Sequence, residues 1–294
     1  MSSIRMPPHR TRQRGYSLIE IMISLLIGAV MIGAVLTAVS GTGLSGTRQS
    51  GHAQLSEDGQ IALNLIATQL RMGGFWEPTS PVSSLHNTQP MLFGCRNGFS
   101  SVTAAFGSLA CATGTGNDSV AVRYDTNEGG TTGFDCLGAA VPAGATPPGW
   151  VDNRFYIATG PSGNPSLFCR GNGGGDPQML VDNVETLQLR YGIAQAAAAG
   201  NSDLLFDRGT FAGQTVRYVR ADALLTTCPR LSPASNSWCG VTAVRVCITM
   251  RTAPGAGPTT GTAFVNCDGT STTIADSRLR RSMVTTVSLR NRMP

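Results

Sequence analysis

The longest apolar run in the chain covers residues 18–39, and Glu20 is the only charged residue within it. At about 1.5 Å per residue, a helix of this length spans roughly 33 Å, which is enough to cross the hydrocarbon core of a bilayer. A carboxylate in hydrocarbon costs about 2.5 kcal/mol or more. The pattern therefore predicts a membrane-spanning helix, and it requires an explanation for Glu20.

A second pattern, over residues 54–72, has the period of an amphipathic helix. One face of the helical wheel carries apolar residues, namely Leu55, Ala62, Leu63, Ile66 and Leu70. The opposite face carries polar ones, namely Ser56, Glu57, Gln60, Asn64, Thr68 and Arg71. Such a stripe needs an apolar partner, and a β-sheet is the obvious one. We expect a weak or bent point at the glycine-rich residues 41–46 and a helix end at Gly73-Gly74.

The last third of the chain shows the period-two alternation of strands. It is clearest in residues 179–192, 241–252 and 282–292, the last preceded by the charged segment DSRLRRS. The side chains expected to point inward are Val184, Leu187, Leu189, Tyr191, Val244, Val246, Ile248 and Met250. These segments predict an antiparallel sheet that the amphipathic helix covers. Residues 75–178 are rich in Gly, Ser, Thr, Pro and Asn, and predict a loop-rich β region with short strands near 119–125 and 154–160.

Charge sets the orientation of the apolar run. The apolar run is preceded by four arginines and by no acidic residue; the arginines are Arg5, Arg10, Arg12 and Arg14. Because positively charged flanks stay in the cytoplasm, the N-terminus is expected there. Everything after about Gly41 is then expected on the other side of the membrane. The remainder of the chain is nearly neutral, which argues against nucleic-acid binding. A cleaved secretory signal ending near Ala38 and Ser40 is the alternative, although its apolar core is normally 7–15 residues.

All eight cysteines follow the apolar run, and none forms a CxxC pair. They are Cys95, Cys111, Cys136, Cys169, Cys228, Cys239, Cys247 and Cys267. An even number on the exported side of a membrane segment indicates four disulfides in an oxidising compartment such as a bacterial periplasm. The alternative is buried free thiols in a cytosolic protein. Eight cysteines allow about 105 pairings, and Cys228–Cys239 and Cys247–Cys267 are the pairs that close short loops around expected strand ends.

Candidates for chemistry are few. The three histidines are His9, His52 and His86, and the chain has no GxSxG nucleophile elbow. The stretch GNGGGDP (171–177) precedes a strand-like segment, so a hairpin turn is favoured over a phosphate loop. Asp176, Asp182 and Glu185 lack the spacing of a calcium loop. We therefore expect no catalytic residue, no cofactor and no metal.

The junction between the basic leader and the apolar run resembles the signal of type IV prepilins. That signal combines a short basic leader, a glycine, an aromatic or hydrophobic first residue and a glutamate at the fifth mature position, and here these fall on Gly15, Tyr16 and Glu20. The resemblance implies cleavage by prepilin peptidase between Gly15 and Tyr16, and N-methylation of Tyr16. Tyr and Ser stand at 16 and 17 where Phe and Thr are commonest.

That cleavage would give Glu20 a physical function. It creates a positive amine on Tyr16, and in a stack of offset helices Glu20 can face the amine of a neighbouring subunit. Opposite charges attract strongly in a medium of low dielectric constant, and each alone is costly to bury. The alternative is that Glu20 reaches the membrane interface and has no function.

Three further segments resemble the PilW family of large minor pilins, which is related to the J-type pseudopilins of type II secretion. They are LVDNVETLQLRYG, Trp238 followed closely by VTAVRVCITMRT, and the terminal VSLRN. The resemblance implies an α+β, type IV pilin-like fold. It has a long N-terminal helix, transmembrane and then amphipathic, packed on an antiparallel β-sheet head with loop-rich, disulfide-stapled insertions.

This resemblance divides the chain into a leader (1–15), a transmembrane half-helix (16–40), a periplasmic half-helix (41–74) and a head (75–294). The implied role is to initiate assembly of a type IV pilus near its tip. The implied partners are other minor pilins, the major pilin, a tip adhesin and prepilin peptidase. The protein would lie in the inner membrane before assembly and in the pilus afterwards. A minor pseudopilin of type II secretion is the nearest alternative, and an unrelated anchored periplasmic enzyme or binding protein is a further one.

Overall fold

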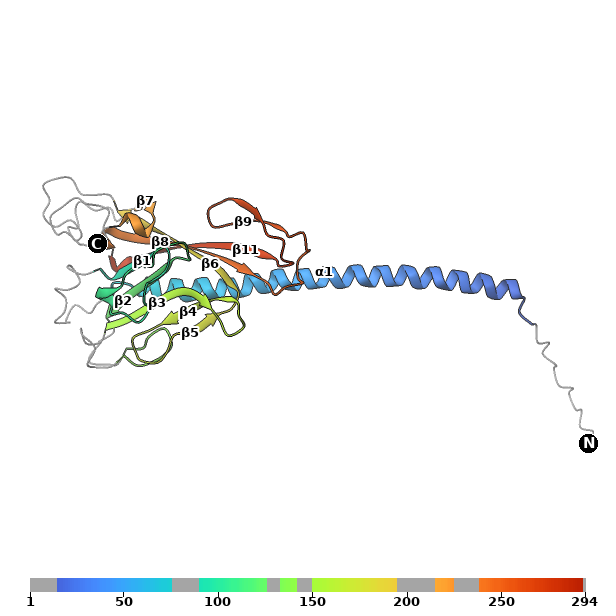
Figure 1. The fold of residues 1–294 in the computed structure, drawn as a ribbon, viewed down its shortest axis with the longest axis horizontal. Helices are drawn as coiled ribbons and strands as arrows, with labels where there is room; N and C mark the ends of the chain where they lie inside the picture. The colour runs from blue at the N-terminus through green and yellow to red at the C-terminus, as the bar shows by residue number, and fades with distance from the viewer. Residues whose placement is uncertain are drawn as a thin grey trace, which may run out of the picture. The chain divides into compact units, whose positions relative to one another are not determined.

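The computed structural model describes residues 15–75, 90–125, 133–141, 150–194, 215–224 and 238–292, without the side chains of 40–45, Cys239 and Arg292. By its internal contacts the chain divides into two compact units, residues 1–50 and 51–294. Helix α1, Leu18–Met72, contributes to both units, and every described strand belongs to the second (Figure 1).

Helix α1 is continuous through the glycine-rich residues 41–46. The glycines expected to weaken the helix therefore do not end it, because extension from helical residues on both sides offsets their low propensity. The predicted stop is present. The helix ends at Met72, the N–H of Gly73 donates to the carbonyl of Leu70, and Gly74 adopts a φ of 77°, a conformation that glycine reaches without strain.

A four-stranded antiparallel sheet is built from the last third of the chain. Its strands are β6 Val184–Ala194, β7 Thr215–Val219, β8 Val241–Arg251 and β11 Arg280–Ser288, in the order β11-β8-β6-β7. The eight side chains expected to point inward are all buried, at 0–1% exposure. A register shift between Val184 and Thr186 explains why the buried positions of β6 skip from 184 to 187.

The middle of the chain is more regular than its composition suggests. Five antiparallel strands follow one another in a meander, namely β1 Leu92–Cys95, β2 Ser119–Asp125, β3 Trp150–Thr159, β4 Pro165–Arg170 and β5 Gln178–Val181. Polar residues inside these strands are buried, among them Asn153 and Arg154. Because of them, apolar and polar residues do not alternate regularly, and this alternation is what would have predicted the strands. The stretch 171–177 joins β4 to β5 as a hairpin turn, as expected.

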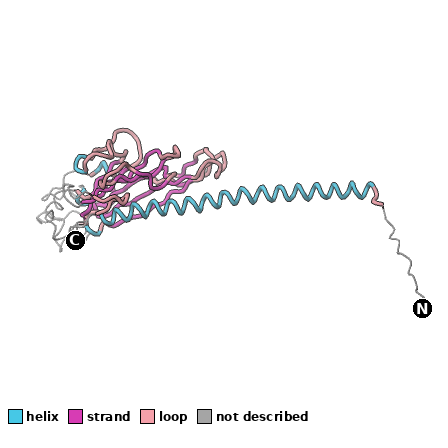
Figure 2. The backbone as a smooth tube through the Cα atoms, turned by 90° about the horizontal axis from the view of Figure 1, so that it is seen from below, coloured by secondary structure: helices cyan, strands magenta, loops and turns pink. Residues whose placement is uncertain are grey.

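Short elements complete the head. A small hairpin pairs β9 Ala263–Val265 with β10 Ser271–Thr273. Single 3₁₀ turns occupy η1 Phe106–Ser108, η3 Ala221–Ala223, η4 Trp238–Gly240 and η5 Arg290–Arg292. The main core combines side chains from both larger sheets and from α1, and the strands gather around the end of the helix that follows Ser50 (Figures 1 and 2).

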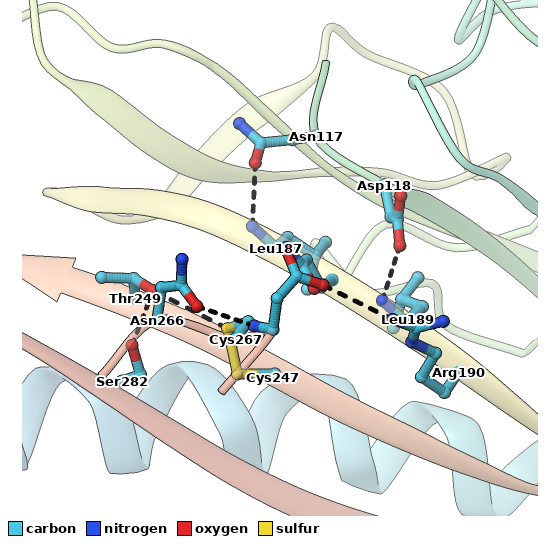
Figure 3. The surroundings of a disulfide bond; sticks show 12 residues. Asn117, Asp118, Leu187, Leu189, Arg190, Cys247, Thr249, Asn266, Cys267 and Ser282 are labelled. Atoms are coloured by element: carbon cyan, nitrogen blue, oxygen red, sulfur yellow. Dashed lines mark hydrogen bonds and ion pairs between the residues drawn. A yellow bond between two sulfur atoms is a disulfide. The ribbon is translucent and has the colours of Figure 1, made fainter. Parts of the chain in front are cut away.

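Three disulfides are present in the described part of the head. They join Cys95 to Cys111, Cys136 to Cys169, and Cys247 to Cys267. The last pair is the one predicted from loop length, and it ties the segment that follows β9 to strand β8 (Figure 3). The other predicted pair, Cys228–Cys239, lies outside the described residues, because neither Cys228 nor the side chain of Cys239 is described.

Candidate functional site

The candidate assembly site begins where the apolar helix begins. Helix α1 starts at Leu18, and the carbonyl of Ser17 accepts hydrogen bonds from the N–H groups of Glu20 (3.0 Å) and Ile21 (3.3 Å). Glu20 therefore lies in the first helical turn, where the positive end of the helix dipole favours a carboxylate. Tyr16 is 80% exposed and directly follows Gly15. The structure thus places Gly15, Tyr16 and Glu20 in one short exposed segment.

The first half of α1 presents apolar side chains on every side. Large apolar residues from Leu18 to Val39 are 51–76% exposed, with no polar face between them. The span Leu18–Val39 is long and apolar enough to cross a membrane, as judged by length and composition. A soluble surface helix would bury one face. This surface therefore requires lipid or other apolar helices around it.

The second half of α1 contacts the head through the predicted stripe. Leu55, Ala62, Leu63, Ile66 and Leu70 are all buried, at 0–4% exposure. The polar residues predicted for the opposite face are exposed, except Ser56, which is half-buried.

Strand β11 follows this half of the helix along its length. Just before the strand, the side chain of Leu279 lies about 3.3 Å from the position that a Cβ on residue 51 would take, so it packs closely against Gly51. Within the strand, the guanidinium of Arg281 donates to the hydroxyl of Ser56 at 2.6 Å, and the side chain of Met283 lies against Gly59. At the helix end, the amide of Asn291 donates to the carbonyls of Arg71 (3.0 Å) and Met72 (3.3 Å). The bond to Arg71 satisfies a carbonyl that a helix end leaves unpaired, and the Met72 carbonyl also accepts from the N–H of Phe75 at 2.9 Å.

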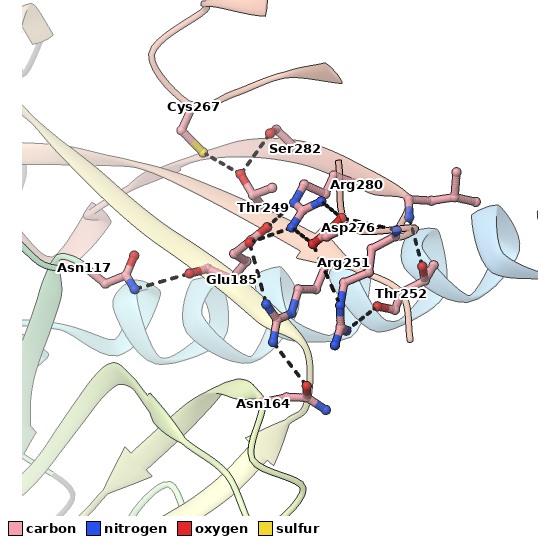
Figure 4. A network of polar contacts seen from close by, with 12 residues as sticks. Asn117, Asn164, Glu185, Thr249, Arg251, Thr252, Cys267, Asp276, Arg280 and Ser282 are labelled. Carbon is pink, nitrogen blue, oxygen red and sulfur yellow. Dashed lines mark hydrogen bonds and ion pairs between the residues drawn. The ribbon is translucent and has the colours of Figure 1, made fainter. Parts of the chain in front are cut away.

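A buried arginine organises the start of β11. The Arg280 guanidinium donates to both oxygens of Glu185 (2.6 and 3.0 Å) and of Asp276 (2.8 and 2.6 Å), as Figure 4 shows. The hydrogen bonds from Arg280 lower the pKa of the Asp276 carboxyl below its usual range. Arg251 lies beside Glu185 and donates to the amide oxygen of Asn164 at 3.1 Å. The network joins β6, β8 and β11 to the turn before β4, so its function is structural.

The two sheets are joined by Asn117 and Asp118, just before β2. The N–H of Leu187 donates to Asn117 Oδ1 at 3.0 Å, and that of Leu189 donates to Asp118 Oδ2 at 2.7 Å (Figure 3). Asp118 is buried, and this burial raises the pKa of its carboxyl to about 6. Sequence reasoning missed both residues, because an acidic residue before a strand looks like part of an exposed turn.

The residues considered for chemistry are not brought together. Asp182 accepts from Ser162 and Ser166, whereas Glu185 binds Arg280. Within the described ranges, no three His, Cys, Asp or Glu residues form a group that could hold a metal ion. His52 is exposed on α1, and His9 and His86 lie outside the described residues.

The family described as Type IV Pilus-assembly protein W, PilW, matches residues 154–291, and the prokaryotic N-terminal methylation motif matches residues 10–36. No curated protein matches. Among solved structures, a type IV-like pilin from Thermus thermophilus is similar at 13% identity and a TM-score of 0.37, over 82% of this chain and 100% of that one.

The two family matches agree with the geometry at both ends of the chain. The methylation motif covers Gly15, Tyr16, Glu20 and most of the exposed apolar helix. The PilW match covers the whole four-stranded sheet on which the second half of α1 packs. The PilW match points to a structural pilin rather than an enzyme. Together, the PilW match over residues 154–291 and the methylation motif over residues 10–36 support a type IV pilin-like protein of the PilW family.

Proposed function

We propose that this protein is a minor subunit of a type IV pilus that prepilin peptidase cleaves after Gly15, and that it helps to start assembly near the pilus tip. One observation carries the proposal. A methylation motif leads directly into a helix whose first turn holds Glu20 and whose following turns expose apolar side chains on all sides. A lone carboxylate at the start of such a helix is costly in lipid and useful in a helix stack.

In this mechanism, cleavage leaves a positive amine on Tyr16, and N-methylation keeps its charge. In a stack of offset helices, Glu20 of one subunit pairs with the Tyr16 amine of the next. The pair forms in a medium of low dielectric constant, where an unpaired charge is strongly disfavoured. The charge pair thereby fixes the offset between helices, while the surrounding apolar side chains supply the contact area.

The remaining parts of the chain take complementary roles in the proposal. Residues 16–40 anchor the protein in the inner membrane, 41–74 extend into the periplasm, and 75–294 form the head. The head's disulfides suit an oxidising periplasm. The other minor pilins, the major pilin and a tip adhesin are its partners. A head of this size would crowd its neighbours if it repeated along a filament, whereas at the tip nothing lies above it. The PilW match supports a subunit of a pilus over a subunit of a type II secretion pseudopilus.

Mass spectrometry of the N-terminal peptide tests the processing step. The expected mature peptide begins at N-methylated Tyr16. Gly15→Ala should leave uncut precursor in the membrane, because a side chain at that position obstructs the peptidase. A mature start near Gly41 would instead indicate signal peptidase, and would refute the pilin mechanism.

Glu20→Ala tests the assembly step separately. The variant should be cleaved normally but should assemble poorly, so that surface pili fall sharply while the major pilin in the membrane stays constant. Glu57→Ala is the matched control, because Glu57 is an exposed carboxylate on the second half of the same helix. Full piliation with Glu20→Ala would refute the charge-pair mechanism.

Quantitative mass spectrometry of sheared filaments tests the proposal that this chain is a minor subunit. That proposal fails if this chain is as abundant in the filaments as the major pilin.

A further inference from the structure

Among the strands that the structure describes, one edge of the four-stranded sheet is unlike the other sheet edges. The five-stranded sheet ends in β1 and β5, each of four residues, and β7 at the far edge of the four-stranded sheet has five. Edge strand β11 has nine residues and pairs with β8 in an unshifted register from Arg280 to Ser288. Natural proteins usually keep edge strands short or interrupted, because a long edge invites pairing with another chain.

The hydrogen bonds at its two ends show which backbone groups of β11 face outward. The N–H of Thr252 donates to the carbonyl of Leu279, and the N–H of Leu289 donates to the carbonyl of Thr242. In an antiparallel pair the bonded residues alternate, so the odd-numbered residues between them bond to β8. The N–H and C=O groups of the even-numbered residues therefore point away from the sheet, at Arg280, Ser282, Val284, Thr286 and Ser288.

These outward groups have no hydrogen-bond partner among the residues that the structure describes. The strand is also accessible, because Val284 is 58% exposed, and Thr286 and Ser288 are exposed as well. The charged residues of β11, Arg280 and Arg281, stand at its first two positions, and Ser282–Ser288 contain no proline and no charged residue, the residues that commonly protect an edge. The edge is therefore competent to accept another strand.

A groove beside the second half of β11 gives this edge a chemical preference. It has a volume of about 600 Å³ and lies between Thr286–Ser288 and the end of α1. Met72 and Phe75 line it and are 37% and 42% exposed, and two arginines, Arg71 and Arg290, also line it. The groove thus offers an apolar surface with two positive charges close to a line of free backbone groups.

We propose that β11 is a docking edge for an extended strand of another protein, and that this strand carries an apolar side chain and a carboxylate on the face toward the groove. The backbone of the strand would continue the sheet beyond β11, as in other cases of strand addition. Its apolar side chain would cover Met72 and Phe75, and its carboxylate would meet Arg71 and Arg290. The proposal does not depend on where the subunit lies in a filament.

Charge argues against a second copy of this chain as the occupant. If two β11 strands paired antiparallel about Val284, the copy's Arg281 would lie opposite Val287 and its Arg278 opposite Arg290. This arrangement would bring further arginines to a groove that already holds two, and like charges across a strand pair are destabilising.

The test uses the full-length chain in detergent and fluorescein-labelled nine-residue peptides of alternating Thr and Val. In one peptide a Val is replaced by Glu, in a second by Lys, and a third repeats the Glu peptide with N-methyl groups on alternate amides. Fluorescence anisotropy should show that the Glu peptide binds, that the Lys peptide binds about tenfold more weakly, and that N-methylation abolishes binding.

Paired proline variants separate docking from folding. Val284→Pro removes an outward N–H and should weaken binding of the Glu peptide about tenfold while the melting temperature stays nearly constant. Thr285→Pro removes an N–H that bonds to β8, and should lower the melting temperature.

A charge-reversal pair tests the groove. Arg290→Glu should reverse the preference between the Glu and Lys peptides. Arg48→Glu makes the same charge change outside the groove and should not reverse it.

Three results would overturn the proposal. The first is equal binding of the Glu peptide to the unmodified chain and to Val284→Pro, or no binding to either. The second is equal binding of the Glu and Lys peptides. The third is a concentration-dependent dimer that Val284→Pro abolishes, because it would assign the edge to a second copy of this chain.

Discussion

The two halves of α1 have the same backbone conformation and opposite surface requirements. From Leu18 to Val39 the large apolar side chains are at least half exposed on all sides, whereas from Leu55 to Leu70 one stripe is buried and the opposite face is polar. Helical propensity alone does not distinguish the halves, because both are helical throughout. The distribution of apolar residues around the helix determines whether a segment is completed within its own chain or requires lipid or other subunits.

This difference implies that each half can be disrupted without the other. The second half contributes to the stability of the head, because its stripe is part of the main core. The first half contributes nothing to that core, so changes there should affect membrane insertion and assembly only. The following variants test this separation, from the largest expected effect to the smallest.

Ile66→Asp should have the largest effect. Ile66 is fully buried in the core, and the substitution loses its packing and buries a carboxylate, so the head should lose about 4 kcal/mol or more of unfolding free energy. Denaturant unfolding followed by tryptophan fluorescence measures the change. Ile61→Asp is the matched control, because Ile61 is 47% exposed on the same helix and its substitution should cost about 1 kcal/mol or less.

Ile27→Asp provides the complementary test in the first half. It should leave head unfolding unchanged and should impair membrane insertion, at a cost of about 2.5–3.5 kcal/mol near the centre of the helix. Membrane fractionation measures the insertion. A fall in head stability with this variant would show that the two halves are not independent.

Asp118→Asn tests the sheet on which the second half packs. Burial raises the pKa of Asp118 from 3.8 to about 6, so the folded head binds a proton more tightly than the unfolded chain does. The contribution of this group to stability is therefore present below about pH 4 and is lost as the pH rises through about 6.

The side-chain amide that this substitution introduces would keep an acceptor for the Leu189 N–H without a buried charge. The variant should be more stable than the unmodified head at pH 8, by up to about 3 kcal/mol, and the difference should vanish near pH 4. Thermal unfolding across this pH range measures it. A constant difference at all pH values would mean that Asp118 does not titrate in this range.

Gly59→Val should have the smallest effect among the variants that change the core of the head. A Cβ at this position meets the flexible end of the Met283 side chain and lies 3.1 Å from Met250 Cγ, so the Met283 side chain must move aside and Met250 must shift slightly, at a cost of about 1–3 kcal/mol. Gly33→Val is the matched control in the first half, because a Cβ there has no neighbour within 4 Å. Equal unfolding midpoints for these two variants would show that close approach at Gly59 does not matter.

The sequence predicted the parts of the structure that depend on periodicity. The stripe on α1, the inward side chains of β6 and β8, and the stop at Gly73-Gly74 follow from side-chain spacing and backbone geometry, and the structure confirms them. The Cys247–Cys267 pair followed from loop length and is also present. The motif around Gly15 was recognisable because its residue types occur in a fixed order.

Other features depend on tertiary contacts and could not be predicted. The five-stranded meander was underestimated because its strands bury polar residues such as Asn153 and Arg154 within hydrogen-bond networks. The link from Asp118 to Leu189 joins residues that are far apart in the sequence. The edge of β11, which is unpaired among the described residues, could not be predicted either, since strand order and register decide which backbone groups remain unpaired.

The alignment of β11 with the second half of α1 has a mechanical consequence. The contacts run in the same order along α1 and along β11 with its flanking residues, from Gly51 with Leu279, through Ser56 with Arg281, to Arg71 with Asn291. A pulling force that enters the head along the helix therefore loads these contacts together, in shear, and does not peel them apart one after another. We expect the head to resist tension along α1 far better than tension applied across it.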